Sequence, residues 1–193
     1  TLSLAPDYIK VRALKYARDI NKYAYKFHLP ADLIFAVIHT ESYFNAKARS
    51  SAPAYGLMQL VPVSGARDAF QFVYRRDEIP TANYLYQANN NIELGTAYLR
   101  LLITRDFKNV HNSNSQILCA IAAYNTGAGN VSFAFTGTTN LTLAIPKING
   151  LNYAELYAYL RKYLPSAETR DYIKKVSTRM KMYHKWEKTW PTK

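Results

Sequence analysis

Apolar residues recur at helical spacing from the first residues of the chain. Within residues 6–29, Ile9, Ala13 and Ala17 repeat every four residues, as on the buried face of an amphipathic helix. Pro30 ends this helix, and it suits the first position of the next because its fixed φ is already helical. The pattern therefore predicts a leading helix up to residue 29 and a second helix over residues 30–41.

Similar patterns continue along the rest of the chain. They predict helices over about 89–104, 115–124, 152–163 and 167–186, with Asn152 and Glu155 arranged as a capping pair. Residues 45–56 are rich in Ala, Ser and Pro and are expected to form a loop. Residues 126–150 contain four glycines and many Thr and Asn, so we expect a long loop with short extended pieces. The fold class is mainly α, with six or more helices and little sheet, in one domain of residues 1–193.

Composition adds an expected partner class. The 193 residues are 49% hydrophobic, and 25 Lys and Arg against 13 acids give a formal charge of +12. This excess favours an anionic partner such as nucleic acid, a membrane surface or an acidic polymer. The 17 tyrosines could also line a polymer-binding groove, because a tyrosine ring stacks on sugars and bases.

Disulfide and metal chemistry are not expected. Cys119 is the single cysteine and lies in an apolar stretch, which predicts a buried thiol. The four histidines lack metal-ligand spacing. We therefore expect no metal and no cofactor.

Glu41 is the candidate catalytic residue. Leu33, Val37 and Glu41 fall at i, i+4 and i+8, so they share one helix face. Burial disfavours a charged carboxylate, and the negative end of the helix dipole acts in the same direction. A carboxyl that stays protonated near neutral pH is what a general acid requires. Taken alone, a glutamate at this position is more often a solvated residue at a fraying helix end.

Several short motifs accompany Glu41 in a fixed order. They are Glu41-Ser42, Gly56-Leu57-Met58-Gln59, Asn91 to Leu99, Ala123-Tyr124-Asn125-Thr126-Gly127 and Glu168-Thr169-Arg170-Asp171-Tyr172. In this order and spacing, residues 25–180 resemble the soluble lytic transglycosylases, glycoside hydrolase family 23. The resemblance implies a lysozyme-like helical domain of the goose-type and soluble-lytic-transglycosylase kind. It also implies an enzyme that cleaves peptidoglycan.

The resemblance also implies roles for particular residues. Glu41 would be the single catalytic acid and base, with Ser42 beside it orienting the substrate or the carboxyl. The other substrate-binding residues would be Met58 and Gln59 on one wall, Tyr124 and Asn125 on the other, and Tyr172 near the catalytic glutamate.

A single carboxylate suits this family. Ordinary glycosidases need two, yet residues 42–59 contain no Asp or Glu, where a goose-type lysozyme would be expected to carry a second acid. The substrate's own acetamido and C6 hydroxyl groups would replace the missing acid and the water. The expected product is a 1,6-anhydro-N-acetylmuramic acid end.

The resemblance implies peptidoglycan strands as the partner and makes nucleic acid an unexpected one. It also implies a periplasmic location, with attachment to the outer membrane through an amino-terminal lipid outside this chain. One alternative is a hydrolase on the same fold. A second, from a different class, is a non-catalytic binder of glycan or nucleic acid, which tyrosine richness and positive charge favour but which leaves the placement of Glu41 unexplained.

Overall fold

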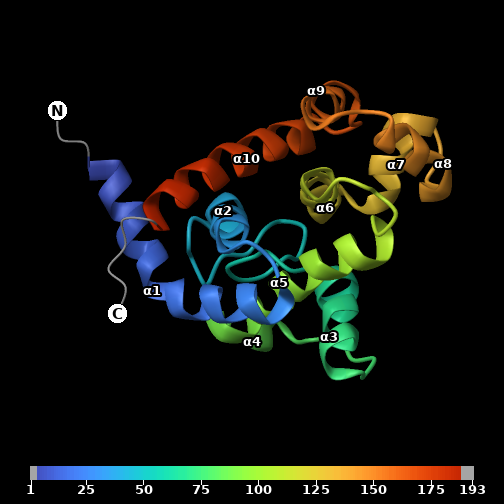
Figure 1. The fold of residues 1–193 in the computed structure, drawn as a ribbon. Helices are drawn as coiled ribbons and strands as arrows, with labels where there is room; N and C mark the ends of the chain where they lie inside the picture. Colours follow the sequence, from blue (N-terminus) through green and yellow to red (C-terminus); the bar gives the residue numbers. More distant parts are fainter. Residues whose placement is uncertain (1–3, 188–193) are drawn as a thin grey trace. The chain divides into compact units, whose positions relative to one another are not determined.

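The computed structural model describes residues 4–187, which are mainly helical (Figure 1). The α-helices are α1 (Leu4–Phe27), α2 (Ala31–Ser42), α3 (Arg67–Tyr74), α4 (Ala82–Leu85), α5 (Ala88–Leu101), α6 (Ser113–Thr126), α7 (Ala128–Thr136), α8 (Leu141–Asn149), α9 (Tyr153–Tyr163) and α10 (Ala167–Glu187), with π-helical turns η1 (Pro62–Ala66) and η2 (Leu102–Asp106). Within this described part, extended pairing is limited to bridges of Tyr55 with Arg49 and Leu60. The predicted mainly α fold is confirmed.

The chain forms two compact units. Leu99–Ser177 form the second unit, and the remaining described residues form the first. Helices α5 and α10 each contribute residues to both units because the boundaries fall inside them.

In the first unit α1 packs against α2 (Figure 1). Helix α2 is buried on nearly all sides, since every residue from Leu33 to Ile38 has no exposed surface. The carboxy-terminal part of α10 packs there through Tyr183, whose ring stacks on Phe35 with centroids 5.2 Å apart. This apolar packing holds α2 from several directions and so fixes where its last turn lies.

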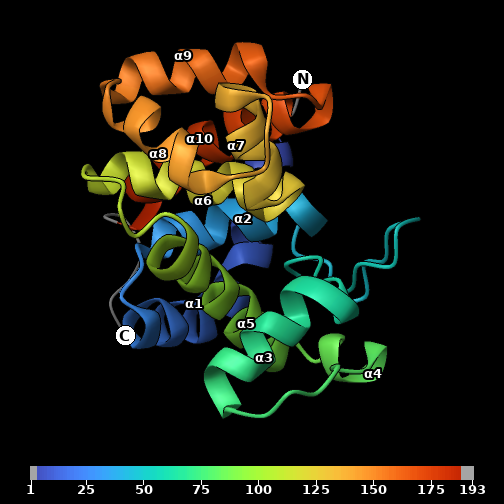
Figure 2. The ribbon, with the colours of Figure 1, turned by 90° about the vertical axis from the view of Figure 1, so that its right-hand side faces the viewer.

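In the second unit α6, α7, α8 and α9 pack together (Figure 2). Their presence corrects the expectation of a long loop over residues 126–150, which instead form α7 and α8. Gly127 and Gly137 adopt positive φ at the two ends of α7, where they separate helices rather than preventing them. Asn140 caps α8 by accepting a hydrogen bond from the Thr142 N–H at 3.0 Å.

Predicted local features further along the chain are confirmed. The Asn152 side chain accepts from the Glu155 N–H at 3.0 Å, and the Glu155 carboxylate accepts from the Asn152 N–H at 2.9 Å. Cys119 is fully buried, and burial raises the pKa of its thiol to about 12. A thiol in this state is inert at neutral pH.

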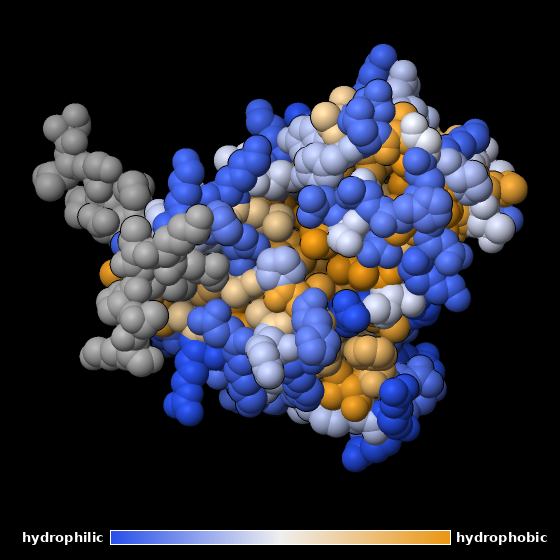
Figure 3. Space-filling model, viewed as in Figure 1, coloured by the Kyte–Doolittle hydropathy of each residue, from blue (hydrophilic) through white to orange (hydrophobic). Residues whose placement is uncertain are grey.

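The surface in Figure 3 is mostly hydrophilic, with scattered hydrophobic residues between the polar ones. Exposed examples are Val63, Phe133 and Leu143. Across residues 4–187, no helix combines the length and the apolar character needed to cross a bilayer.

Candidate active site

Glu41 lies in the last turn of α2 and is half-buried. Pro30 precedes the helix in an extended conformation, with ψ 134°, so the helix begins one residue later than predicted and ends one residue later. Tyr43 ends it in the left-handed conformation, with φ 51°. A carboxyl group thus stands where a buried helix reaches the surface.

The Ser42 side chain is hydrogen-bonded to the Gly56–Gln59 segment rather than facing solvent. Its hydroxyl is buried, donates to the Leu57 carbonyl at 2.7 Å and lies 3.2 Å from the Ile38 carbonyl oxygen. The residue next to Glu41 therefore fastens the Gly56–Gln59 segment to the end of α2.

We expect Ser42→Ala to lower the free energy of unfolding by about 1–3 kcal/mol, because it leaves the Leu57 carbonyl buried without its donor. Urea unfolding measures the change. Thr104→Ala is a matched control, since the exposed Thr104 hydroxyl donates to the Arg100 carbonyl of its own helical segment at 2.8 Å. Equal losses in the two variants would contradict the fastening role of Ser42.

The Gly56–Gln59 segment is a tight loop with two left-handed residues, Gly56 at φ 79° and Gln59 at φ 46°. The Gln59 Nε2 donates to the Ala48 carbonyl at 3.1 Å and to the Gly56 carbonyl at 2.8 Å. Met58 is fully buried. Both side chains thus hold the loop in place, and the Gln59 nitrogen is already occupied within the loop.

Asn91 supports this loop through hydrogen bonds of its side-chain amide, and it was not predicted as a site residue. Its Oδ1 accepts from the Met58 N–H at 2.7 Å, and its Nδ2 donates to the carbonyls of Tyr55 and Leu85, each at 2.8 Å. The side chain has no exposed surface. The Met58 N–H and the Tyr55 carbonyl belong to the loop and its approach, and the Leu85 carbonyl lies at the end of α4.

Gly95, one turn further along α5, leaves room for Met58. A Cβ at this position would lie 2.3 Å from the Met58 sulfur and 2.8 Å from its Cβ. The Gly-Leu-Met-Gln motif and the Asn91 to Leu99 segment are therefore two halves of one packed structure. Their joint occurrence in the sequence is the signal that could have singled out Asn91.

The remaining predicted residues lie in the second unit. Asn125, near the end of α6, accepts at Oδ1 a hydrogen bond of 2.7 Å from the hydroxyl of the buried Thr169 on α10. Tyr124 is half-buried, and Tyr172 is buried. The structure thus groups Glu41, Ser42, Met58 and Gln59 in the first unit, and Tyr124, Asn125 and Tyr172 in the second. Thr169 is a positioning residue that the sequence reasoning missed.

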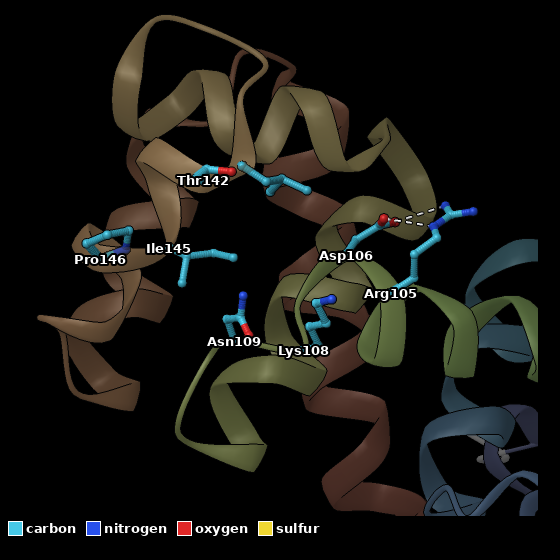
Figure 4. A pocket seen from close by; sticks show the side chains of 8 residues that line it. Arg105, Asp106, Lys108, Asn109, Thr142, Ile145 and Pro146 are labelled. Carbon is cyan, nitrogen blue, oxygen red and sulfur yellow. Dashed lines mark hydrogen bonds and ion pairs between the residues drawn. The ribbon is translucent and has the colours of Figure 1, made fainter.

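A pocket of about 390 Å³ lies in the second unit between α8 and the turn after η2 (Figure 4). Arg105 and Asp106 on its wall form an ion pair at 2.8 Å. None of the predicted site residues lines it. The pocket is thus separate from the motifs around Glu41.

His39 lies on α2 two residues before Glu41 and is 8% exposed. Its Nδ1 is 3.0 Å from the Tyr183 hydroxyl. Burial, and secondarily the nearby Arg179 charge, lowers the His39 pKa to about 4. His39 is therefore neutral in the folded protein near neutral pH.

We expect this histidine to make stability pH-dependent. The unfolded chain takes up the proton below about pH 6.5 while the native state resists it to about pH 4, so stability is complete above that window and is lost as pH falls through it. Between about pH 7 and about pH 4.5 the loss attributable to His39 is about 2–3 kcal/mol. Urea unfolding of wild type and His39→Gln measures it, and exposed His111→Gln is the control. An equal pH dependence in wild type and His39→Gln would contradict this assignment.

Residues 18–143 match the family described as the transglycosylase SLT domain. The chain belongs to this family, which confirms the resemblance drawn from the motifs. It is similar to the membrane-bound lytic murein transglycosylases C of Serratia proteamaculans (36% identical), Sodalis glossinidius (37%) and Klebsiella pneumoniae (37%), over 96% of this chain and 51% of each relative. The chain thus spans about half the length of these curated relatives.

Solved structures agree with the fold. An inactive mutant of the lytic transglycosylase Slt from Pseudomonas aeruginosa superposes with a TM-score of 0.67 and 26% identity, over 89% of this chain and 24% of that chain. The 70-kDa soluble lytic transglycosylase of Escherichia coli gives a TM-score of 0.65 at 24% identity, with the same coverage. The predicted fold of the soluble lytic transglycosylases is confirmed.

Proposed function

We propose that the chain is a peptidoglycan lytic transglycosylase that cleaves the β-1,4 bond between N-acetylmuramic acid and N-acetylglucosamine without water. The observation that supports this proposal most directly is the position of Glu41. Its carboxyl group lies at the surface end of a buried helix, beside a loop that Ser42 and Asn91 hold in place. The solved P. aeruginosa relative is an inactive mutant with a glutamate-to-glutamine exchange, which supports one essential glutamate.

In this mechanism Glu41 acts twice. Its carboxyl group first protonates the glycosidic oxygen. The bond from C1 to that oxygen breaks, the N-acetylglucosamine side leaves with a free 4-hydroxyl group, and the muramoyl acetamido oxygen stabilises the anomeric carbon. The resulting carboxylate then takes the proton of the C6 hydroxyl of the same sugar, whose oxygen closes onto C1. Glu41 ends protonated as it began, and the closing step gains from the high effective concentration of an intramolecular nucleophile.

The other site residues bind the glycan or shape the site that receives it. Met58 is buried, so we assign it to supporting the wall, with Ser42 fastening that wall to α2. Gln59 retains its Oε1 as an acceptor for sugar groups. Asn125 has its Oδ1 occupied by Thr169, which orients the amide and leaves Nδ2 as a donor to an acetamido carbonyl. The half-buried Tyr124 is assigned to the glycan as well, whereas the buried Tyr172 is assigned to supporting the site.

The proposed partner is the peptidoglycan strand, whose stem peptides carry carboxylates that attract a chain of charge +12. We place the protein in the periplasm, close to an anionic wall or membrane surface. The names of the relatives describe them as membrane-bound, which supports this location.

Borohydride reduction of the products tests the reaction type. Muropeptides released from purified sacculi should be unchanged by borohydride, because a 1,6-anhydro end has no reducing aldehyde. A hydrolase would release muropeptides that each gain two hydrogens. That second outcome would replace the transglycosylase with a hydrolase on the same fold.

A further inference from the structure

Two arginines converge on one exposed tyrosine directly after the Glu41-Ser42 pair. Tyr43 is 51% exposed. Arg12 on α1 donates from Nη1 to the Tyr43 carbonyl at 3.0 Å. Arg179 on α10 donates from Nη2 to the Tyr43 hydroxyl at 3.1 Å, and its guanidinium carbon lies 5.1 Å from the ring centroid. We call Arg12, Tyr43 and Arg179 the Tyr43 platform.

The platform is held rigidly in an unfavourable backbone conformation. Tyr43 and the buried Phe44 are both left-handed, with φ 51° and φ 61°, a backbone conformation that is unfavourable for residues other than glycine. Arg179 also donates to the Thr40 hydroxyl at 2.9 Å, and the Tyr43 ring lies 5.1 Å from the His39 ring. Contacts from α1, α2 and α10 thus fix an aromatic ring two residues from Glu41.

The charge of the platform is not neutralised by neighbouring acids. Among residues 4–187, no carboxylate lies within ion-pair distance of Arg12 or Arg179, whereas Arg67 and Arg76 pair with Asp77 and Glu78. The positive charge of Arg179 acts on its neighbour His39, because it contributes, after burial, to the lowering of the His39 pKa. Each guanidinium also has N–H groups beyond those used on Thr40 and Tyr43.

We infer that the Tyr43 platform is a subsite for a carboxylate-bearing portion of the glycan strand. The exposed part of the Tyr43 ring stacks on a sugar, and the two guanidinium groups bind the carboxylate beside it. The inference rests on the proposed function, because it takes the ligand to be the glycan strand that Glu41 cleaves. The carboxylate is either the lactyl group of muramic acid in a peptide-free strand or an acid of the stem peptide.

Binding measured by calorimetry on the catalytically blocked Glu41→Gln protein tests the subsite. Three ligands are compared: a neutral oligomer of N-acetylglucosamine, a peptide-free glycan strand and a peptide-bearing strand. We expect Arg12→Met and Arg179→Met each to weaken binding of a carboxylate-bearing strand about tenfold, because each removes a charge-assisted contact, and to weaken binding of the neutral oligomer far less. Tyr43→Ala should weaken all three ligands.

Arg18→Met, on the exposed face of α1, is the matched control for loss of one charge, and thermal unfolding checks that each variant is folded. A loss confined to peptide-free strands identifies the lactyl carboxylate, and one confined to peptide-bearing strands identifies the stem peptide. Equal losses for neutral and acidic ligands, or the same loss in Arg18→Met, would overturn the subsite. The borohydride result is independent of these affinities, so failure of the proposed reaction is told apart from failure of the subsite.

Discussion

Glu41→Gln should reduce the rate of peptidoglycan cleavage about a thousandfold or more, with no change in fold. General acid or base catalysis by one group contributes about 10²–10⁴-fold, and in the proposed mechanism Glu41 supplies both functions. The amide has nearly the same size and keeps a polar group at the half-buried position, so thermal unfolding should be unaltered. The rate of release of soluble muropeptides from sacculi is the measurement.

Glu78→Gln is the control, because Glu78 is exposed and pairs with the exposed Arg76 at the surface. It should retain the wild-type rate. Affinity of Glu41→Gln for sacculi should also persist, since the change removes chemistry and not the wall that holds the strand. Cleavage that survives in Glu41→Gln would remove the catalytic assignment and favour a binder or another acid.

Asn91→Ala should be the most destabilising single change near the site. It leaves the Met58 N–H and the carbonyls of Tyr55 and Leu85 without their partner, in a position with no exposed surface. We expect a loss of about 3–5 kcal/mol in the free energy of unfolding. Because the loop that carries Gln59 then loses its support, cleavage should fall as well, even at temperatures where the variant is folded.

Asn90→Ala is the control on the same helix, since Asn90 is half-exposed. Asn91→Asp sharpens the test. A carboxylate would face two carbonyl oxygens and should be as harmful as alanine near neutral pH, with partial recovery when acid protonates it. A loss below about 1 kcal/mol in Asn91→Ala would contradict the role of Asn91 as the support of the loop.

Much of the fold was predictable because the helices carry their own signals. Pro30 marks the junction of α1 and α2, and the Asn152 and Glu155 pair caps α9 as expected. Residues 126–150 were misjudged because glycine and threonine content outweighed a weaker pattern. Val131 and Phe135 in α7, and Ala144 and Ile148 in α8, are buried pairs four residues apart, which was the helical signal.

The site was predictable as a set of motifs but not as a set of contacts. Glu41 and its neighbours stand out because their order matches a known family. The contacts of Asn91 with Met58, of Thr169 with Asn125 and of Arg179 with Tyr43 join residues that are 33, 44 and 136 positions apart. Such pairings follow from tertiary packing, and no local periodicity in the sequence encodes them.

Cleavage of purified sacculi in water enriched with ¹⁸O, followed by mass spectrometry of the released muropeptides, tests the central claim most directly. A reaction in which Glu41 delivers the C6 hydroxyl to C1 consumes no water, so we expect products at the anhydro mass without ¹⁸O. Muropeptides that carry ¹⁸O at a reducing end would show that water is the nucleophile and would contradict the proposed chemistry.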